Sequence, residues 1–562
     1  MKRIVVLTLV LLVLVLAVSA PTSSSSETLI VQANNVETAV AVAQAYGGQI
    51  THELAIINAV SADFPEGALA LMEKDKRVLA VMPEQTVEAA GVQTNRSHLP
   101  QADFPEVMGV DEVWDAHVKG NGVGVALVDS GINRLPNLRR NIVARYDVLN
   151  RNRWLNDEYG HGTMMASLIA NSTRDSNGFI GIAPKVDLID VRVLDRQGKG
   201  TYTNIIDGLN WVLENKDEYN IRVVNLSIVG AVNSPYWADP LNMAVEALWD
   251  AGIVVLAASG NGGSDPLTVS VPGNDPYIIT VGAFTDNYTP EDSSDDYITP
   301  FSGAGPTEVG FVKPDVVAPG AHMLVQGMPL SVWNSQHYDS WIQGLYYEIA
   351  GTSAATAVTT GVVALMLDEN PDMTPNQVKY ALMNSAQTAA YDDGSLTWSL
   401  FQQGAGRVNA AEAVLNPPQG EANLGMEIGQ EYVGPVVYRD DTFQIVDAEG
   451  NVIPETAGYA WTGGYAWTGG YAWTGGYAWT GGYAWTGGYA WTGGYAWTGG
   501  YAWTGSTDWQ PLEEGDVWQS GYAWTGGYAW TGGYAWTGGY TWTGGYAWTG
   551  GYAWTGLIDS AE

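Results

Sequence analysis

Cysteine is absent from the 562 residues of this sequence. Its absence excludes a disulfide framework, a thiol nucleophile, and zinc or iron–sulfur sites built on thiolates. Positive charge is also scarce, because 24 Lys and Arg residues stand against 60 Asp and Glu residues, for a formal net charge of −36. A surface this acidic repels polyanions, so nucleic acid and anionic lipid are excluded as partners.

Tryptophan and glycine, by contrast, are abundant, and a C-terminal repeat supplies many of them. The unit GYAWTG recurs every six residues over 458–505 and again over 521–556, and no Lys or Arg follows Arg439. The Gly-Gly pair between units is a two-residue hairpin signal, so neighbouring units are expected to pair as a meander. Two interpretations stay open for this repeat tail, residues 458–556. It is either an aromatic module that contacts glycan or a cell surface, or a Gly-rich tail without a fixed fold.

The first twenty residues, 1–20, have the features of a secretory signal peptide. Met1-Lys2-Arg3 supplies the positive region, Ile4 to Val18 the apolar region, and Val18-Ser19-Ala20 a small-residue cleavage site. The apolar run is shorter than the roughly 20 residues that span a bilayer, which favours a cleaved signal over an uncleaved anchor. The sequence therefore predicts a secreted, extracellular protein, and the repeat tail leaves cell-surface association open.

Between the signal peptide and the repeat tail, the spacing of apolar residues divides the sequence into two regions of different predicted fold. Residues 27–90 are predicted to form a small α+β unit with the ferredoxin-like order β-α-β-β-α-β. Residues 91–105 are predicted to be a linker. Residues 106–416 alternate Val- and Ile-rich runs of strand length with helical stretches. Apolar runs without polar alternation indicate a parallel sheet buried on both faces, so this region predicts a doubly wound α/β domain.

The segment 417–457 is predicted to be a linker between the α/β domain and the repeat tail. It begins with Pro417-Pro418, and few contacts are expected to cross it. A chain that ends near Gly420 is therefore expected to keep full activity.

Four polar side chains stand where strands end or helices begin, which is where function collects in such a sheet. Asp129 ends the strand VGVALV, His161 opens a helix in YGHGTMMAS, and Ser353 opens a helix in GTSAATAV. Asn261 follows a strand in AASGNGG and is placed to donate a side-chain N–H to an oxyanion near Ser353. Each residue alone also suits a structural role, as a turn aspartate, a structural histidine, a helix cap or a loop asparagine. All four in this order favour catalysis.

With these residues in view, the sequence resembles the subtilisin-like serine proteases, the subtilase family (peptidase S8). The motifs VDSGI, GHGTMMAS, NLSIVG, AASGN and GTSAAT follow the family's order across residues 106–416. The resemblance implies a serine endopeptidase with Asp129, His161 and Ser353 as its catalytic triad and Asn261 in the oxyanion hole.

The same resemblance extends to the N-terminal unit. It implies that residues 27–90 are an inhibitory propeptide, so that the enzyme is made as a zymogen whose own propeptide is its inhibitor. The other implied partners are protein or peptide substrates. Self-cleavage is expected between about Glu88 and Gln101, because that stretch lacks periodicity and can enter a cleft extended.

Substrate is expected to bind along two strand ends, which comprise Ser227, Ile228, Val229, Gly230, Ala258, Ser259 and Gly260. The family often has two glycines after the NLS-apolar motif, whereas Val229 here precedes Gly230. The β-branched Val229 is expected to narrow the first specificity pocket, and AASGNGG carries no acid to pair with a basic side chain. A second departure is Ala357, where the family usually has proline, and alanine is compatible with the same helix.

No cofactor and no catalytic metal are expected from the resemblance. Many members of the family bind structural calcium, so structural calcium is compatible with this chain, with its ligands unknown. The acidic loop DNYTPEDSSDD, residues 286–296, could supply such ligands, but the preferred interpretation is solvated surface.

An alternative function also fits the composition. In it, the chain is a cell-surface adhesion or carbohydrate-binding protein whose protease domain is inactive or serves only in processing. The complete set of Asp129, His161 and Ser353 favours the secreted endopeptidase, and covalent labelling of Ser353 by a fluorophosphonate probe separates the two.

Overall fold

The computed structural model describes residues 26–89, 102–149, 156–175, 178–391, 395–447 and 450–453, apart from positions 66 and 73. In the repeat tail it describes only the backbone of six short strands. The predicted signal peptide and most of the repeat tail lie outside the described residues. Among the helices that are described, none combines the length and the apolar character needed to cross a membrane.

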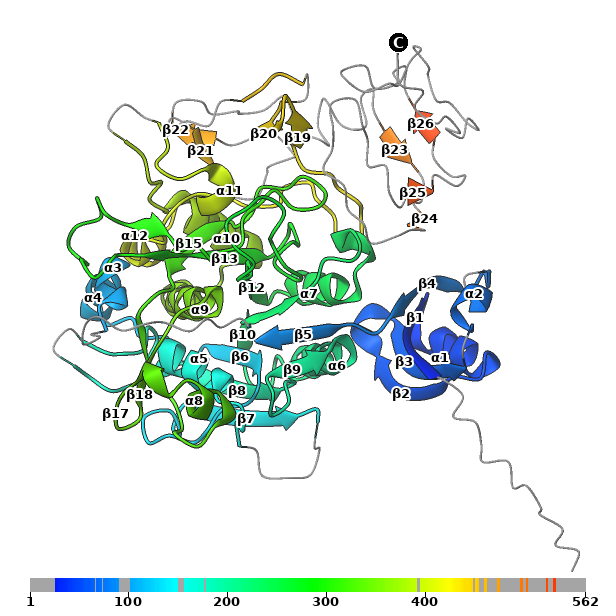
Figure 1. Cartoon of the computed structure of the whole chain (residues 1–562), viewed down its shortest axis with the longest axis horizontal. Coiled ribbons are helices and arrows are strands. Elements are labelled where there is room, and N and C mark those ends of the chain that lie inside the picture. The colour runs from blue at the N-terminus through cyan, green and yellow to red at the C-terminus, as the bar shows by residue number, and fades with distance from the viewer. Residues whose placement is uncertain are drawn as a thin grey trace, which may run out of the picture.

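The N-terminal unit is a four-stranded antiparallel sheet with helices on it, at the right of the view in Figure 1. Its strand order is β2-β3-β1-β4, and it has a small core of its own, centred on Leu29, Val42 and Phe64. Helix α1 begins where the Asn35 side chain accepts a hydrogen bond from the Thr38 N–H. The elements are β1 (Ser26–Ala33), α1 (Val36–Ala45), β2 (Gln49–Leu54), a 3₁₀ turn (Ala55–Ile57), β3 (Ala59–Pro65), α2 (Leu69–Met72) and β4 (Val78–Pro83).

The main sheet has eight strands in the order β14-β13-β12-β10-β6-β8-β7, with β15 paired to β13. Every pair in it is parallel except β13–β14. The expected α/β architecture with a mostly parallel sheet is therefore confirmed. The strands are β6 (Gly124–Asp129), β7 (Ile142–Asp147), β8 (Asp187–Arg192), β10 (Ile221–Leu226), β12 (Val254–Ala258), β13 (Ile279–Thr285), β14 (Tyr297–Ile298) and β15 (Val316–Pro319).

Helices cover the main sheet in two packed pairs, α5 with α9 and α6 with α7. Their starts are marked by capping: the Thr201 side chain accepts from the Asn204 N–H before α6, and Asp239 accepts from two N–H groups before α7. The helices of this domain are α3 (Phe104–Val107), α4 (Val110–Asp115), α5 (His161–Ala170), α6 (Tyr202–Glu214), α7 (Pro240–Asp250), α8 (Val332–Gln336), α9 (Thr352–Glu369), α10 (Pro375–Asn384), α11 (Leu400–Gln403) and α12 (Ala410–Leu415).

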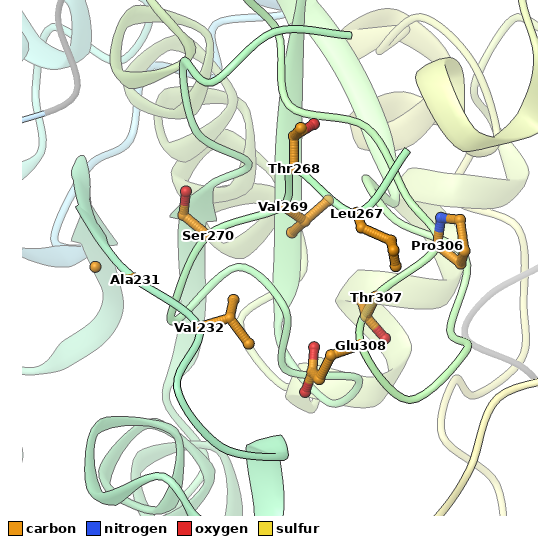
Figure 2. Close-up of a pocket in the computed structure, with 10 residues that line it drawn as sticks. Ala231, Val232, Leu267, Thr268, Val269, Ser270, Pro306, Thr307 and Glu308 are labelled. Carbon is orange, nitrogen blue, oxygen red and sulfur yellow. The ribbon is translucent and has the colours of Figure 1, made fainter. Parts of the chain in front are cut away.

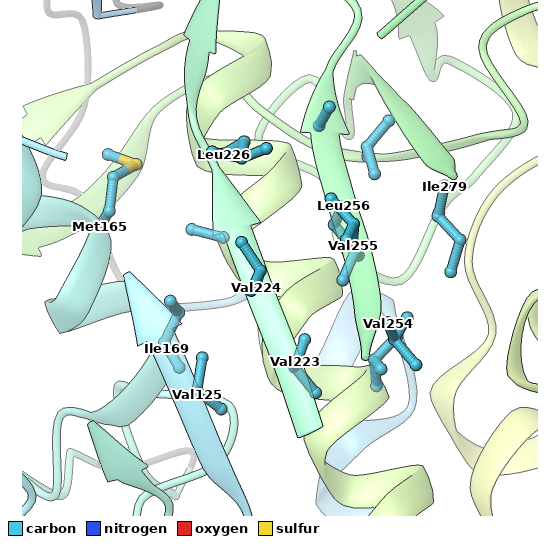
Figure 3. Close-up of a cluster of buried hydrophobic side chains, with 14 of the residues drawn as sticks. Val125, Met165, Ile169, Val223, Val224, Leu226, Val254, Val255, Leu256 and Ile279 are labelled. Carbon is cyan, nitrogen blue, oxygen red and sulfur yellow. The ribbon is translucent and has the colours of Figure 1, made fainter. Parts of the chain in front are cut away.

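The core includes buried side chains of the sheet, of the α5–α9 pair and of the α6–α7 pair. Figure 3 shows valines and leucines of β10 and β12 beside Met165 and Ile169 of α5. Helix α9 is buried from Thr352 to Leu367, so it is apolar around most of its circumference. This burial fixes the start of α9, and with it Ser353, against the carboxyl ends of the strands.

The prediction that residues 417–457 form a linker is wrong for 421–453. A hairpin of β19 (Val436–Arg439) and β20 (Thr442–Ile445) packs on the α/β domain, and Val436, Ile445 and Ile453 join its core. The Gly434 N–H donates to the Val309 carbonyl at 2.7 Å. The packing of this segment on the α/β domain could not be predicted from its composition. Its few apolar residues are spaced apart, and they contact residues that are distant in the sequence.

Further short strands lie outside the main sheet. They are β5 (Thr86–Ala89), β9 (Lys199–Thr201), β11 (Ile228–Gly230), β16 (Met323–Gln326), β17 (Trp341–Gln343) and β18 (Tyr346–Ile349). Two further 3₁₀ turns span Tyr236–Ala238 and Tyr338–Ser340.

The described strands of the repeat tail do not join neighbouring units, so the predicted meander is not found in them. Trp461 pairs with Trp473, which lies two units further on, and Trp497 pairs with Trp530. These strands are β21 (Tyr459–Trp461), β22 (Trp473–Gly475), β23 (Ala496–Thr498), β24 (Ala502–Trp503), β25 (Tyr522–Ala523) and β26 (Ala529–Thr531).

Candidate active site

Asp129 and His161 meet at the end of β6 and the start of α5. His161 Nδ1 lies 3.0 Å from Asp129 Oδ1 and 2.9 Å from Oδ2. A carboxylate only accepts hydrogen bonds, so Nδ1 carries the proton and Nε2 is left as the basic nitrogen of the neutral ring. Both side chains are buried, with Asp129 fully inaccessible, and the Ser130 N–H donates to Asp129 Oδ1 at 2.7 Å. The carboxylate is thereby held in place to orient the imidazole.

The glycines on either side of His161 are required by close packing. A Cβ on Gly162 would lie 2.3 Å from the Gly131 carbonyl oxygen, and one on Gly160 would lie 2.4 Å from Ser331 Oγ. Gly160 also has a φ of 110°, a conformation that glycine adopts most readily. The motif Gly-His-Gly therefore lets the start of α5 approach the end of β6, which brings the imidazole to the carboxylate.

Asp157 is a positioning residue that the sequence analysis missed. It is buried, and its carboxylate accepts hydrogen bonds from the Gly160 N–H at 2.6 Å, the Thr163 N–H at 2.8 Å and the Ser130 hydroxyl at 2.8 Å. It therefore ties the loop before α5 to the loop after β6. Burial raises the pKa of Asp157, while these hydrogen bonds act in the opposite direction. An acidic residue four positions before a helix that begins with histidine was the available signal.

Ser353 is the second residue of α9, within the first helical turn, whose N–H groups have no acceptor inside the helix. Its side chain is buried, and its hydroxyl makes no hydrogen bond to any part of the described chain. Ser227 donates its hydroxyl to the Ser353 carbonyl at 3.0 Å, which joins the end of β10 to the start of α9. Since α5 and α9 pack against each other, His161 and Ser353 stand in the first turns of one packed pair of helices.

Asn261 lies beside the start of α9. Its Oδ1 accepts hydrogen bonds from both the N–H and the hydroxyl of Thr352, each at 3.0 Å. Because Oδ1 is occupied in this way, the amide nitrogen Nδ2 is the end of the side chain that remains for a ligand at Ser353. Asn261 is therefore oriented as a hydrogen-bond donor next to the serine.

Of the expected substrate-binding residues, Ile228, Val229 and Gly230 form strand β11. The position between β11 and β9, here called the groove, is filled by a strand of the same chain. Strand β5 lies between β9 and β11 as the middle strand of a three-stranded antiparallel sheet. Glu88 pairs with Val229 on one side and with Lys199 on the other, and Ala89 pairs with Ile228. Figure 1 shows β5 running from the N-terminal unit toward the main sheet. An extended segment of this chain is thus added as a strand between β9 and β11.

The N-terminal unit also contacts the helices next to this groove. The Glu84 carboxylate accepts from the Thr203 N–H at 3.0 Å in the first turn of α6, where a negative charge is favourable. The Asn210 side chain accepts from the Ile56 N–H at 3.0 Å. The unit and the strand β5 therefore dock together, so the groove is occupied by a tethered segment.

The second expected wall of the groove, Ala258 to Gly260, follows β12, which is the neighbour of β10 in the sheet. All three residues are buried. A Cβ on Gly260 would lie 2.4 Å from Ser270 Oγ, so Ser270 is a further residue at this wall. It follows the motif AASGN by nine residues but belongs to no recognised motif, and nothing in the sequence pointed to it.

A pocket of about 240 Å³ opens beside the end of β11 (Figure 2). It is lined by Gly230, Ala231, Val232, Leu267, Thr268, Val269, Ser270, Pro306, Thr307 and Glu308. Glu308 is an acid that the sequence analysis did not place near the groove. Its Oε1 accepts from the Tyr236 N–H and from Asn274, each at 3.0 Å, and burial raises its pKa to about 8. At neutral pH the carboxyl group is therefore mostly protonated and does not present a fixed negative charge to a basic side chain.

One cluster of potential metal ligands occurs among the described residues: Asp103, Asp286 and His322. Asp286 is the first residue of the acidic loop 286–296. Calcium takes oxygen ligands, so the imidazole in this cluster does not fit calcium. The described part of the chain therefore offers no three-residue His, Asp and Glu cluster that suits the structural calcium considered above.

Comparison with known proteins agrees with this arrangement. Residues 120–406 match the family described as "Subtilase family". The chain is 40% identical over 302 residues to the serine protease AprX of Bacillus subtilis, covering 52% of this chain and 66% of that protein. It is 31% identical over 370 residues to subtilisin E of Bacillus subtilis, covering 65% of this chain and 83% of that protein.

A similar fold is found in a solved structure. The crystal structure of fervidolysin from Fervidobacterium pennivorans, described as a keratinolytic enzyme related to subtilisin, aligns with a TM-score of 0.57 and 21% identity. The alignment covers 77% of this chain and 65% of that one. The chain thus spans just under two thirds of the length of AprX and of fervidolysin.

Proposed function

Because this chain belongs to the subtilase family and is a serine endopeptidase, we propose that it hydrolyses peptide bonds through Asp129, His161 and Ser353, and that it is secreted as a zymogen. The observation that carries the proposal is the pair of hydrogen-bonded contacts at the strand ends. Asp129 holds His161, and Asn261 is oriented beside the buried hydroxyl of Ser353.

The mechanism follows from these positions. A substrate strand lies in the groove between β9 and β11, which brings its scissile carbonyl to Ser353. Ser353 Oγ attacks that carbonyl while His161 Nε2 accepts the hydroxyl proton, and Asp129 stabilises the resulting imidazolium. The Asn261 amide and the Ser353 N–H stabilise the oxyanion, and loss of one such donor costs about 10²–10³ in kcat. His161 then protonates the leaving amine, and water hydrolyses the acyl-enzyme. No cofactor takes part in these steps.

A fluorophosphonate probe tests the proposal directly, because it labels serine hydroxyls that are activated by a neighbouring base. We expect one label per chain, on Ser353, in the mature protein. A mature, folded chain that is not labelled would support the alternative, a surface-binding protein with an inactive protease domain.

The zymogen state is supported by the strand β5. Three of its residues occupy the groove, and the Ala89 N–H donates to the Gly198 carbonyl at 3.1 Å. A segment in this position excludes other substrates, so residues 27–90 act as an inhibitory propeptide until the chain is cut. The predicted signal peptide, residues 1–20, supports export to the extracellular space.

Self-cleavage is expected between Glu88 and Gln101, within the first few residues after Ala89. The reason is that β5 enters the groove in the manner of a substrate and ends at Ala89, so the bonds that follow are the next to reach Ser353. Intact mass and N-terminal sequencing of the mature protein check this. A mature N-terminus before Thr86 contradicts it. Ala89→Pro removes the N–H that bonds Gly198 and is expected to slow maturation.

The first specificity pocket is expected to accept small or medium apolar residues. Val229 lies on β11, at a position where the family often has a glycine, and Glu308 carries little negative charge at neutral pH because of its raised pKa. Val229→Gly should broaden acceptance toward large aromatic residues by opening the pocket. A peptide library cleaved by both forms measures this preference.

The matched control for that experiment is Val143→Gly, the same change at a partly exposed position on β7. It should leave the cleavage preference unchanged. A parent enzyme that prefers Arg or Lys, or a Val229→Gly enzyme with an unaltered profile, counts against this account of the pocket.

A further inference from the structure

Three potential metal ligands from distant parts of the chain meet at one edge of the main sheet. Asp103 precedes α3, Asp286 follows β13, and His322 precedes β16. One ligand atom of each lies within 4.8 Å of the others. Asp286 and His322 are 3% and 6% exposed, whereas Asp103 is partly accessible. The cluster is thus a nearly closed site with one side toward solvent.

The hydrogen bonds within the cluster leave one buried acceptor unused. His322 Nε2 lies 2.5 Å from Asp286 Oδ1, and His322 Nδ1 lies 3.4 Å from Thr285 Oγ1. The other oxygen, Asp286 Oδ2, is buried and accepts no hydrogen bond from the described part of the chain. A buried carboxylate oxygen without a partner is costly, and such atoms often mark the place of an unseen ion or water.

The cluster also holds more acidic than basic groups. The carboxylates of Asp103 and Asp286 face the single imidazole of His322. Arg407 forms its ion pair with Asp296, at the other end of the same acidic loop. A divalent cation would therefore balance the charge of the two carboxylates.

We propose that Asp103, Asp286 and His322 together bind one divalent transition-metal ion, with Zn²⁺ as the best match. Two carboxylates and one imidazole form a mixed oxygen and nitrogen set, which suits zinc and its neighbours, whereas calcium and magnesium take oxygen ligands. The ring of Tyr288 stacks on His322 at a centroid distance of 4.0 Å and fixes its orientation. Metal binding replaces the proton shared by His322 and Asp286, and water completes the coordination.

The position of Asp103 gives this site a structural role. Asp103 lies just after the stretch in which self-cleavage is proposed, so, if that proposal holds, it belongs to the first residues of the mature enzyme. Its neighbours Ala102 and Phe104 are buried. The metal would join this new chain end to β13 and β16, and its binding free energy would add to the stability of the fold.

The experiment uses the full-length Ser353→Ala chain, which cannot digest itself, after treatment with EDTA and desalting. Titration with Zn²⁺ should show one equivalent bound, and the melting temperature should rise with Zn²⁺ concentration. Co²⁺ should produce visible d–d absorption at the same stoichiometry. Because the chain is inactive, the result does not depend on the proposed peptidase function.

Variants then locate the metal. Asp286→Asn and His322→Gln should each weaken Zn²⁺ binding by at least about tenfold. Asp292→Asn, an exposed change in the same loop, should bind as the parent does. If a variant fails to fold, the Co²⁺ spectrum of the parent decides the question. Absence of stoichiometric Zn²⁺ and Co²⁺ binding to the parent, or parent-like binding by both site variants, overturns the proposal.

Discussion

Ser353→Ala is expected to abolish peptide hydrolysis and to leave the precursor uncut. The Ser353 hydroxyl is the nucleophile in the proposed mechanism. The start of α9 is held by contacts that do not involve this hydroxyl, such as the hydrogen bond from Ser227 to the Ser353 carbonyl. Loss of a triad serine in enzymes with this triad lowers kcat by about 10⁶. The measurement is hydrolysis of a chromogenic peptide by the purified variant, with the precursor followed on a gel.

The matched control is Ser335→Ala, an exposed serine whose hydroxyl donates to the Val332 carbonyl. It should mature and cleave peptide as the parent does. Hydrolysis near the parent rate by Ser353→Ala would show that the triad assignment is wrong. Residual activity at the level of an unrelated protein preparation, together with an intact precursor, is the expected outcome.

Truncation at two points of the C-terminal region should give opposite results. A chain that ends after Ile453 keeps the β19–β20 hairpin and should remain active and stable. A chain that ends at Gly420 loses at least three buried apolar side chains, of Val436, Ile445 and Ile453. At roughly 1.5–3 kcal/mol for each, the loss approaches the whole stability of a typical domain.

The chain that ends at Gly420 also loses polar contacts, which should lower its stability further. The Tyr277 hydroxyl donates to the Glu427 carbonyl at 2.7 Å, and Asn423 donates to the Tyr277 carbonyl at 2.8 Å. Removal of these partners leaves buried groups of the α/β domain exposed or unsatisfied. Thermal melting and soluble yield of the two chains measure the difference. Equal stability of the two chains would mean that residues 421–453 contribute nothing to the fold, contrary to their burial.

Local sequence patterns were sufficient to predict the elements in which one short segment both forms a strand or helix and carries a proposed functional residue. The strands that end at Asp129 and Ala258 and the helices that begin at His161 and Ser353 were predicted from apolar runs and from motifs. Strand β7 was not predicted, because its residues alternate less regularly and several are partly exposed.

The features that were missed depend on contacts between distant residues. Strand β5 has no strong strand signal, and its partners β9 and β11 lie more than a hundred residues away. Asp157 and Glu308 look like ordinary surface acids until the fold buries them. No local pattern can reveal that Asp103, Asp286 and His322 meet, because their proximity is created by the order of strands in the sheet.

If residues 27–90 are the inhibitory propeptide proposed above, the insertion of β5 between β9 and β11 also determines how inhibition depends on concentration. While the chain is uncut, the N-terminal unit is an intramolecular ligand with a very high effective concentration at the groove. Cleavage between Glu88 and Gln101 would turn it into a separate molecule that is held only by its own affinity. From then on, dilution would favour its departure, so a concentrated pool of freshly cut enzyme would stay inhibited, and the same enzyme would become active as it disperses.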